Sequence, residues 1–201
     1  DDQQREKLPP ETAVSETLQL VNYQNITIDN KTITFAKQGM SITLDGIGKG
    51  YIVDEGTAIL RKYGFTNVMV EAGGDLMAAG EKDTAQPWRI GVQSPRPQAE
   101  TTLAKFNLSN QAVATSGDYM QSFTADFSQH HILDPRTGYS APELASVTVK
   151  APSVMLADGL ATAVMVLGQQ AGLQLINQLS HCEGLLVTKA LDTVTTTEFL
   201  I

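Results

Sequence analysis

The chain has 201 residues, enough for one full domain with a substantial core or for two small ones. Its hydrophobic share of 42% and charged share of 18% are typical of an ordinary globular protein. The net charge of −8 and the pI near 4.8 argue against a nucleic-acid partner, because no basic tract is present to release counterions. No apolar run is long and unbroken enough to predict a transmembrane segment. The single cysteine, Cys182, excludes an internal disulfide and a cysteine-based metal cluster.

The first part of the chain is predicted to hold an arm, two helices and a hairpin. Residues 1–10 are polar and end in two prolines, which indicates an arm or linker, and the start at Asp rather than Met favours a processed or shortened N-terminus. A helix is expected over 10–21. Alternating apolar residues on both sides of an Asp-Asn-Lys turn predict a β-hairpin over 26–35. A strand is expected over 41–44, followed by a glycine-rich segment that opens a helix over 46–64.

The rest of the chain reads as short strands with two further helices. The strands are expected over residues 67–71, 76–79, 88–93, 103–108, 112–115, 146–149, 184–188 and 193–200. The helices are expected over 152–168 and 169–179, with Gly168 placed to end the first. Runs of strands broken by a few helices and joined by hairpins indicate an α+β fold with a mainly antiparallel sheet, and we assign residues 11–201 to one domain.

Asp158 is the one charged residue in the apolar helix predicted over 152–168. Apolar residues cover nearly the whole circumference of this helix, so we expect it to be buried. A buried carboxylate must be paired, protonated or bound to a cation, because burying it ionised and alone is costly. Thr162 lies one turn away on the same face, and two oxygen ligands at this spacing suit magnesium or calcium better than zinc. A salt bridge to a distant lysine, with Thr162 bonded to its own helix, is the alternative.

Three glycine-rich or polar loops are candidate binding segments. Residues 46–50 place three glycines and Lys49 at the start of a helix, where backbone amides and a positive charge suit a phosphate. This spacing matches neither the P-loop nor the dinucleotide fingerprint, and a helix cap without a ligand is the alternative. Residues 71–75 contain a Gly-Gly pair that a tight hairpin explains without any function. Residues 115–119 carry hydroxyls and a carboxylate that would either bind a polar ligand or cap a loop.

Residues 130–138 hold two of the three histidines together with Asp134 and an arginine. Successive residues on a strand point to opposite faces, so only one histidine is expected to face inward. Histidine is the usual general base near neutral pH, and Asp134 or a backbone carbonyl would orient it. A solvent-exposed histidine pair is the alternative.

Taken in order, six segments resemble the ApbE family of FAD:protein FMN transferases, the flavin transferases. These segments read SITLDGIGKGYIVD, VMVEAGGDL, WRIGVQSP, VATSGDY, HHILDPRTG and SVTVKAPSVMLADGLATAVMVLG, and they run from about Met40 to Gly168. The resemblance implies an ApbE-like, T-fold-related α+β fold with helices packed on a mainly antiparallel sheet. Family members usually carry a further N-terminal segment that has no counterpart in residues 1–35, so one lobe is expected to be incomplete.

The resemblance also implies a chemistry. Such enzymes bind FAD with Mg²⁺, split its pyrophosphate, attach FMN to a threonine hydroxyl of a target protein through a phosphoester, and release AMP. The metal ligands would be Asp158, Thr162 and the backbone carbonyl of Gly46, and catalysis would involve Asp158, Lys49 and His131. His131, taken as the inward histidine, would be the base or proton shuttle for the acceptor threonine. Residues expected to contact FAD are Gly46, Ile47, Gly48, Lys49, Glu71, Gly73, Gly74, Asp75, Ser116, Gly117, Asp118 and His131.

Two other functions stay open on the sequence. A magnesium-dependent FAD pyrophosphatase would use the same residues with water in place of the threonine. A flavin-binding or assembly protein without turnover is the alternative from another class, and retention of the metal, lysine and histidine positions argues against it. The resemblance implies an exported bacterial protein, in the periplasm or on the outer face of the cell membrane, that modifies redox proteins of the cell envelope. Family members are often lipoproteins, but Cys182 lies too far along the chain to be an N-terminal lipid site. Exposed apolar surface beside the absent lobe is expected to favour a homodimer.

Overall fold

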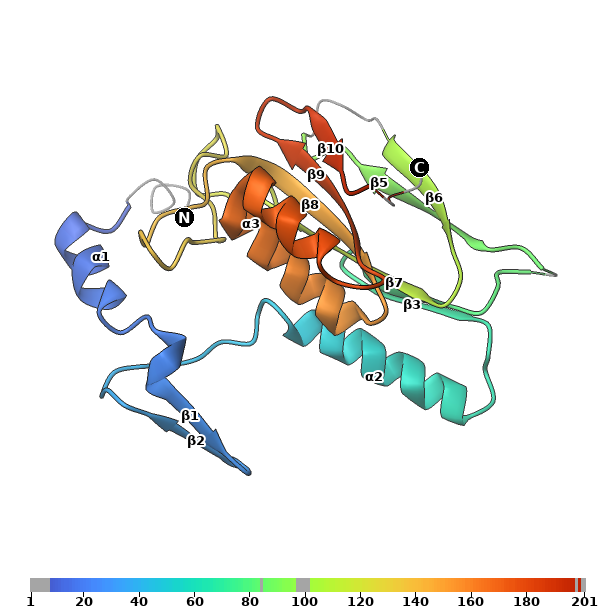
Figure 1. The fold of residues 1–201 in the computed structure, drawn as a ribbon, viewed down its shortest axis with the longest axis horizontal. Coiled ribbons are helices and arrows are strands. Elements are labelled where there is room, and N and C mark those ends of the chain that lie inside the picture. The colour runs from blue at the N-terminus through green and yellow to red at the C-terminus, as the bar shows by residue number, and fades with distance from the viewer. Residues whose placement is uncertain (1–7, 84, 97–101, 198, 200–201) are drawn as a thin grey trace.

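The computed structural model describes residues 8–83, 85–96, 102–197 and 199 (Figure 1), so most of the predicted N-terminal arm lies outside the described residues. The helices are α1 (Glu11–Leu18), the short 3₁₀ helix η2 (Tyr23–Asn25), α2 (Gly48–Lys62) and α3 (Val154–Asn177). The strands are β1 (Ile26–Asp29), β2 (Thr32–Phe35), β3 (Val68–Ala72), β4 (Asp75–Ala79), β5 (Trp88–Gln93), β6 (Thr102–Leu108), β7 (Gln111–Gly117), β8 (Leu144–Ala151), β9 (Glu183–Thr188) and β10 (Thr193–Thr195).

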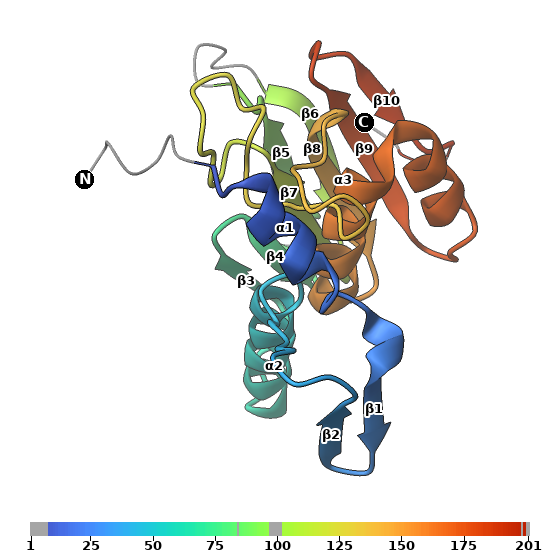
Figure 2. The same ribbon diagram turned by 90° about the vertical axis from the view of Figure 1, so that its left-hand side faces the viewer.

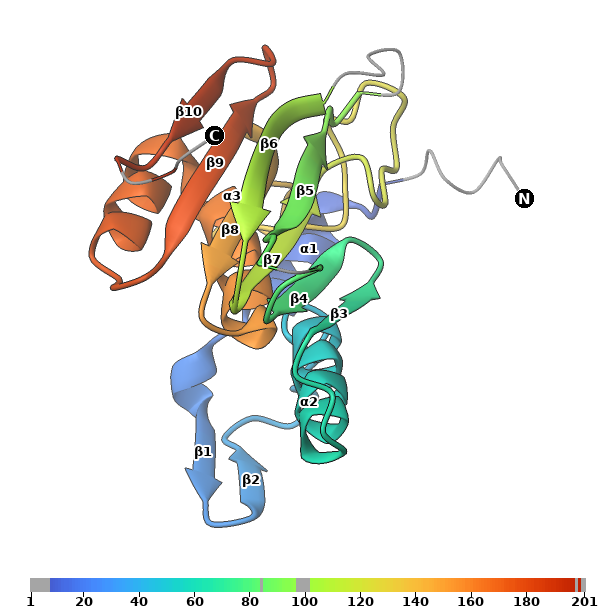
Figure 3. The ribbon, with the colours of Figure 1, turned by 90° about the vertical axis from the view of Figure 1, so that its right-hand side faces the viewer.

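A six-stranded antiparallel sheet in the order β10-β9-β8-β7-β4-β3 forms the centre of the fold. Helices α2 and α3 cover one face, and the two-stranded β5–β6 ribbon lies over the other (Figures 1 and 3). Alternate residues therefore enter two cores: Val147 and Val149 of β8 pack beneath α3, whereas Leu185 and Val187 of β9 face the ribbon. β8 is buried along its whole length because both of its faces are covered. This arrangement confirms the predicted α+β class.

Side-chain and glycine signals set the limits of α3. The Ser153 hydroxyl accepts a hydrogen bond from the Leu156 N–H at 3.3 Å, which is an N-cap contact. The Asp54 carboxylate of α2 accepts from the first two amides of α3, each at 2.9 Å. Gly168 interrupts the helix with φ of 80°, a conformation that favours glycine. The predicted break between two helices at Gly168 is thus confirmed.

α3 is, within the described residues, a helix whose length and apolar composition would allow it to cross a membrane. Val164 is fully buried against the sheet, but Met155, Leu156 and Leu167 are 42%, 40% and 39% exposed. The expectation of burial around the whole circumference is therefore wrong, because the sheet covers only one side of α3. The break at Gly168 also divides the apolar run into pieces shorter than the roughly 20 residues that span a bilayer.

The N-terminal part differs most from the sequence-based expectation. The hairpin of β1 and β2 forms as predicted and extends away from the sheet (Figures 2 and 3), and its Ile28 and Ile33 are 71% and 50% exposed. The strand predicted over 41–44 is wrong: this segment is irregular and exposed, because no strand of the described sheets lies beside it to complete its hydrogen bonds. The strand predicted over 193–200 already ends at Thr195, and part of that range lies outside the described residues.

Candidate functional site

The N-terminus of α2 meets the start of α3 at Asp158. The chain turns sharply before α2, where the Gly48 N–H donates to the carbonyl oxygen of Leu44 at 2.6 Å. Gly50 then lies against α3 so closely that a Cβ atom there would be 2.6 Å from the carbonyl oxygen of Val154. The Gly50 N–H donates to Asp158 Oδ2 at 3.0 Å. Gly50 therefore serves helix packing, and its amide already binds an anion, the Asp158 carboxylate.

Hydroxyl groups from α3 and β7 lie beside this contact. Thr162 faces the loop before α2, since a Cβ atom built on Gly46 would lie 3.7 Å from its methyl group and 3.8 Å from its hydroxyl oxygen. The Thr162 hydroxyl also lies 3.0 Å from the Ser116 hydroxyl of β7. Ile47, the N-cap residue of α2, keeps its side chain 40% exposed. A loop, a strand and a helix thus bring Gly46, Ser116 and Thr162 together, one helical turn from Asp158.

A second buried carboxylate, Asp75, lies at the tight turn between β3 and β4. Gly73 and Gly74 make this turn with φ of 58° and 94°, as the Gly-Gly pair predicts. Lys49 forms an ion pair with Asp75 at 2.9 Å and donates to the Gly73 carbonyl oxygen at 3.4 Å. The other Asp75 oxygen accepts from the backbone N–H of Thr115 at 3.1 Å. Asp75 therefore ties β4 to β7 and fixes the direction of the lysine.

The electrostatics of this cluster favour a cation. Burial raises the pKa of Asp75 and of Asp158 above the ordinary aspartate value, and the negative charge of Asp75 adds to the rise at Asp158. Lys49 opposes both shifts, but one ammonium group for two carboxylates leaves excess negative charge. Within the described residues no group of three or more His, Cys, Asp and Glu side chains is placed to hold a metal. The carboxylate, hydroxyl and main-chain oxygens here are instead the donors that Mg²⁺ and Ca²⁺ prefer, so these residues fit a hard divalent cation.

Two other predicted contact residues have partners within the protein. Glu71 Oε1 accepts from the N–H of Gly74 at 2.6 Å and closes the exposed turn. Asp118 is fully buried, and both of its oxygens are engaged, by Arg96 at 2.8 and 3.0 Å and by Lys189 at 2.5 Å. The structure therefore places the Asp118 carboxylate inside the fold, where both of its oxygens already have partners.

One of the two histidines is buried and the other is exposed, but the buried one is His130, and the segment is a loop with an isolated β-bridge at His130 rather than a strand. His130 Nε2 lies 2.9 Å from the carbonyl oxygen of Ala141, and burial lowers the pKa of this ring. His131 is exposed, and its Nδ1 lies 3.3 Å from the carbonyl oxygen of Gln121, so a backbone carbonyl orients this ring. The expectation that His131 faces inward is wrong, since residues 130–138 form a loop rather than a strand and the surrounding fold decides which histidine is buried. The exposed position leaves His131 accessible to a large substrate.

The turn after the histidines is fastened to the same helix that carries Asp158. The Asp134 carboxylate accepts three hydrogen bonds from the Arg136 guanidinium at 2.7 to 3.0 Å, which lowers the pKa of Asp134. Arg136 also donates to the carbonyl oxygen of Val166 at 3.3 Å. Val166 lies one turn beyond Thr162 on α3, so the turn at 134–138 and the oxygens around Asp158 share one support.

Several residues that organise the site carry no strong signal in the sequence. Asp54 is four residues after Gly50 and so on the same face of α2, and this spacing is a local signal for its contact with α3. Arg96 and Lys189 come from segments far from Asp118, so nothing local marks them. Gly117 is explained by packing, because a Cβ atom there would lie 2.3 Å from the Tyr119 ring.

Comparison with known proteins identifies the family of this chain. The model of the ApbE family matches residues 1–186. The chain belongs to the ApbE family. Its fold is similar to the crystal structure of the ApbE protein from Thermotoga maritima, with a TM-score of 0.86 and 34% identity over 95% of this chain and 63% of that one. It is also similar to the flavin transferase ApbE from Vibrio cholerae, with a TM-score of 0.84 and 29% identity over 96% of this chain and 62% of that one.

Curated relatives of this ApbE-family chain carry the name FAD:protein FMN transferase. The protein from Haemophilus influenzae is 36% identical over 176 residues, which are 84% of this chain and 51% of the relative. The protein from Vibrio cholerae is 31% identical over 187 residues, 92% of this chain and 56% of the relative. The chain thus spans about half the length of the curated relatives that it matches.

Proposed function

We propose that this chain binds Mg²⁺ and the pyrophosphate of FAD, and transfers FMN to a threonine hydroxyl of a target protein with release of AMP. The observation that carries this proposal is the set of two buried carboxylates, Asp158 and the Asp75 that pairs with Lys49 at 2.9 Å, near the hydroxyls of Thr162 and Ser116. Oxygen ligands next to a lysine and a helix N-terminus suit a metal-bound pyrophosphate. The relatives named FAD:protein FMN transferase support the choice of flavin and of reaction.

Each side chain has a distinct part in this proposal. Asp158, Thr162 and the Gly46 carbonyl would hold Mg²⁺, which when bound neutralises phosphate charge and polarises the phosphoryl group. Lys49 donates to a phosphate oxygen, and its ion pair with Asp75 keeps the ammonium group directed at the site. The positive end of the α2 dipole favours the same anion.

His131 is proposed as the general base for the acceptor. It takes the proton of the threonine hydroxyl, and the oxygen then attacks the phosphorus of the FMN phosphoryl group. The bond from this phosphorus to the bridging oxygen breaks, and AMP leaves with the electron pair. The exposed position of His131 supports this role, because the acceptor hydroxyl belongs to another protein. We propose a threonine-bearing redox protein of the cell envelope as the target, on the basis of the family resemblance.

FAD binding in the presence of Mg²⁺ and of excess chelator tests the metal site. Calorimetry should show weaker binding with chelator, because the phosphates and Asp158 repel each other without a cation. Asp158→Ala should remove the dependence on Mg²⁺, and Thr162→Ala should weaken it less, since a hydroxyl contributes a dipole rather than a charge. Asp29→Ala, on the exposed hairpin, is the matched control. Equal affinity with and without chelator would overturn the metal assignment.

A gel assay of flavin fluorescence tests the transfer itself. The target protein should become fluorescent when its acceptor is threonine and stay dark when that residue is alanine. Release of free FMN and AMP without any labelled target would instead identify a pyrophosphatase.

A further inference from the structure

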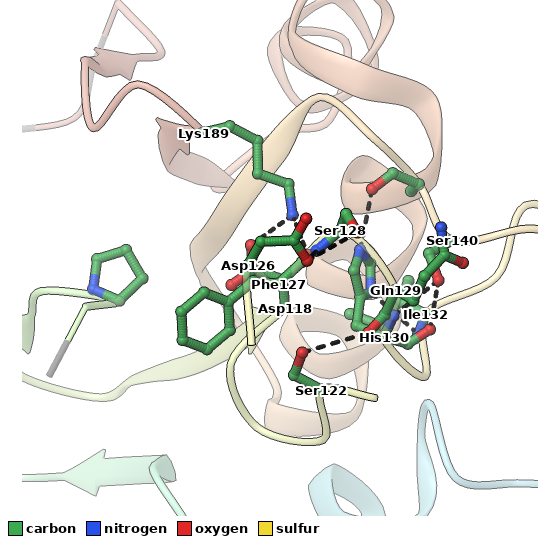
Figure 4. A network of polar contacts seen from close by, with 12 residues as sticks. Asp118, Ser122, Asp126, Phe127, Ser128, Gln129, His130, Ile132, Ser140 and Lys189 are labelled. Carbon is green, nitrogen blue, oxygen red and sulfur yellow. Dashed lines mark hydrogen bonds and ion pairs between the residues drawn. The ribbon is translucent and has the colours of Figure 1, made fainter. Parts of the chain in front are cut away.

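Asp118 is the centre of a buried cluster of charges that the proposed chemistry does not use (Figure 4). Arg96 binds it through two hydrogen bonds and Lys189 through a third, all of them charge-assisted. The Asp118 backbone N–H also donates to the carbonyl oxygen of Ala145 at 2.9 Å. The carboxylate is 0% exposed and has both oxygens engaged, so its role lies in holding its two cations in place.

Both cations reach a second residue, Phe127. Lys189 Nζ donates to the Phe127 carbonyl oxygen at 2.8 Å, and the Arg96 guanidinium lies 4.4 Å from the centre of the Phe127 ring. Phe127 has φ of 60°, a left-handed conformation that a bulky residue adopts only when its surroundings impose it. The cluster around Asp118 supplies that constraint from two sides.

Phe127 lies at the tip of a loop, residues 121–131, whose second arm ends at His131. The two arms are joined by backbone hydrogen bonds, from Phe123 N–H to Gln129 O at 2.7 Å and from His131 N–H to Gln121 O at 3.1 Å. The His131 ring lies against that same Gln121 carbonyl at 3.3 Å. The orientation of the ring therefore depends on how firmly the two arms of the loop are held.

The base of the loop is anchored separately by His130. The Ser140 hydroxyl bridges the backbone of His130, accepting from its N–H and donating to its carbonyl oxygen, both at 2.7 Å (Figure 4). The His130 ring lies 2.9 Å from the carbonyl oxygen of Ala141. Two anchors thus hold the loop, one at its base through His130 and one at its tip through the Asp118 cluster.

We propose that Asp118, through Arg96 and Lys189, is a positioning residue for His131 and makes no contact with FAD. This inference rests on the proposed role of His131 as general base. Holding the tip of the 121–131 loop keeps the imidazole at a fixed place for the acceptor hydroxyl, and such alignment contributes strongly to rate. A side chain that is 0% exposed and already accepts three hydrogen bonds inside the protein has no exposed acceptor to offer a nucleotide.

Lys189→Met tests this positioning role, with Lys189→Arg as the conservative variant. Replacing Lys189 should disturb the fold less than replacing Asp118, because the Lys189 side chain is 26% exposed whereas that of Asp118 is fully buried. Lys189→Met should speed amide hydrogen exchange in residues 121–131 by about ten- to a hundredfold, the worth of a charge-assisted hydrogen bond, and leave α2 and α3 unchanged. Lys189→Arg should restore most of the protection. Lys105→Met, an exposed lysine of β6, should change nothing.

Flavin transfer by the same variants supplies the kinetic test. Lys189→Met should lower kcat by roughly tenfold or more, with KM for FAD and the Mg²⁺ dependence unchanged. Unchanged exchange in residues 121–131, or faster exchange with unchanged kcat, would overturn the inference. A loss of FAD affinity with unchanged kcat would overturn it in favour of a direct ligand contact. If the unmodified chain transfers no flavin, the proposed function fails, and hydrogen exchange still decides whether the cluster holds the loop.

Discussion

Replacing Gly50 by alanine tests the contact between α2 and α3 that assembles the candidate site. A Cβ atom at Gly50 would lie 2.6 Å from the Val154 carbonyl oxygen and 2.7 Å from the Met155 N and Cα atoms. Ordinary contacts begin near 3.4 Å, and the crowding atoms are backbone, so the two helices would have to separate by most of an ångström. The hydrogen bond from the Gly50 N–H to Asp158 would lengthen with them.

The expected cost follows from two opposing effects. Overpacking of this kind lowers the free energy of unfolding by about 1–3 kcal/mol, whereas the better helix propensity of alanine returns at most about 1 kcal/mol. A net loss of about 1 kcal/mol should lower Tm by roughly 2–4 °C in a chain of this size. Thermal unfolding followed by circular dichroism measures this shift. FAD binding with Mg²⁺ should weaken as well, because Asp158 loses its fixed orientation.

Gly56→Ala on the same helix is the matched control. A Cβ atom there would lie 3.7 Å from Val70 Cγ1, which is ordinary van der Waals contact, so only the gain in helix propensity remains. Its Tm should rise by about 2–4 °C. A Gly50→Ala variant as stable as the control would refute the argument that close backbone contact requires glycine at this position.

Three further predictions concern the histidines and the start of α3. His131→Ala should slow flavin transfer by roughly 10²–10⁴-fold in single-turnover assays and leave FAD affinity unchanged in calorimetry. The free energy of unfolding should fall as the pH drops below 6.5, because burial lowers the pKa of His130, so that the unfolded chain binds a proton that the folded chain does not. Urea unfolding between pH 7.5 and 5.5 measures this fall in stability. Asp54→Ala should cost about 0.5–2 kcal/mol in thermal unfolding, since two amides of α3 lose their acceptor.

Each of these predictions has an outcome that contradicts it. Loss of FAD affinity in His131→Ala would make that residue a binding group rather than a base. A pH dependence that survives in His130→Gln would belong to other groups. An Asp54→Ala variant with unchanged Tm would mean that Ser153 alone caps α3.

Features that depend on neighbouring residues were predictable from the sequence. The break at Gly168 and the turn at Gly73 and Gly74 follow from backbone conformations that favour glycine. Asp158 and Thr162 share a face of α3 because four residues make about one turn. The strand predicted over 41–44 failed for the converse reason, since a strand needs a partner that local sequence does not reveal.

Features that depend on distant pairing were decided by the tertiary structure alone. The order of strands in the sheet brings Lys189 to Asp118 across 71 positions, and it brings Asp75 to Thr115 across 40. No local pattern distinguishes the carboxylate of Asp118, which holds two cations inside the fold, from that of Asp158, which accepts a hydrogen bond from the Gly50 N–H.

The sequence by itself determined the helix that carries Asp158 and the glycine turns, because these follow from periodicity and backbone sterics. Only the tertiary structure decided that His130 is buried and His131 exposed, and that Lys49 pairs with Asp75. The physical reason is desolvation: the state and the role of a charged group depend on which other groups exclude water from it, and those groups come from all parts of the chain.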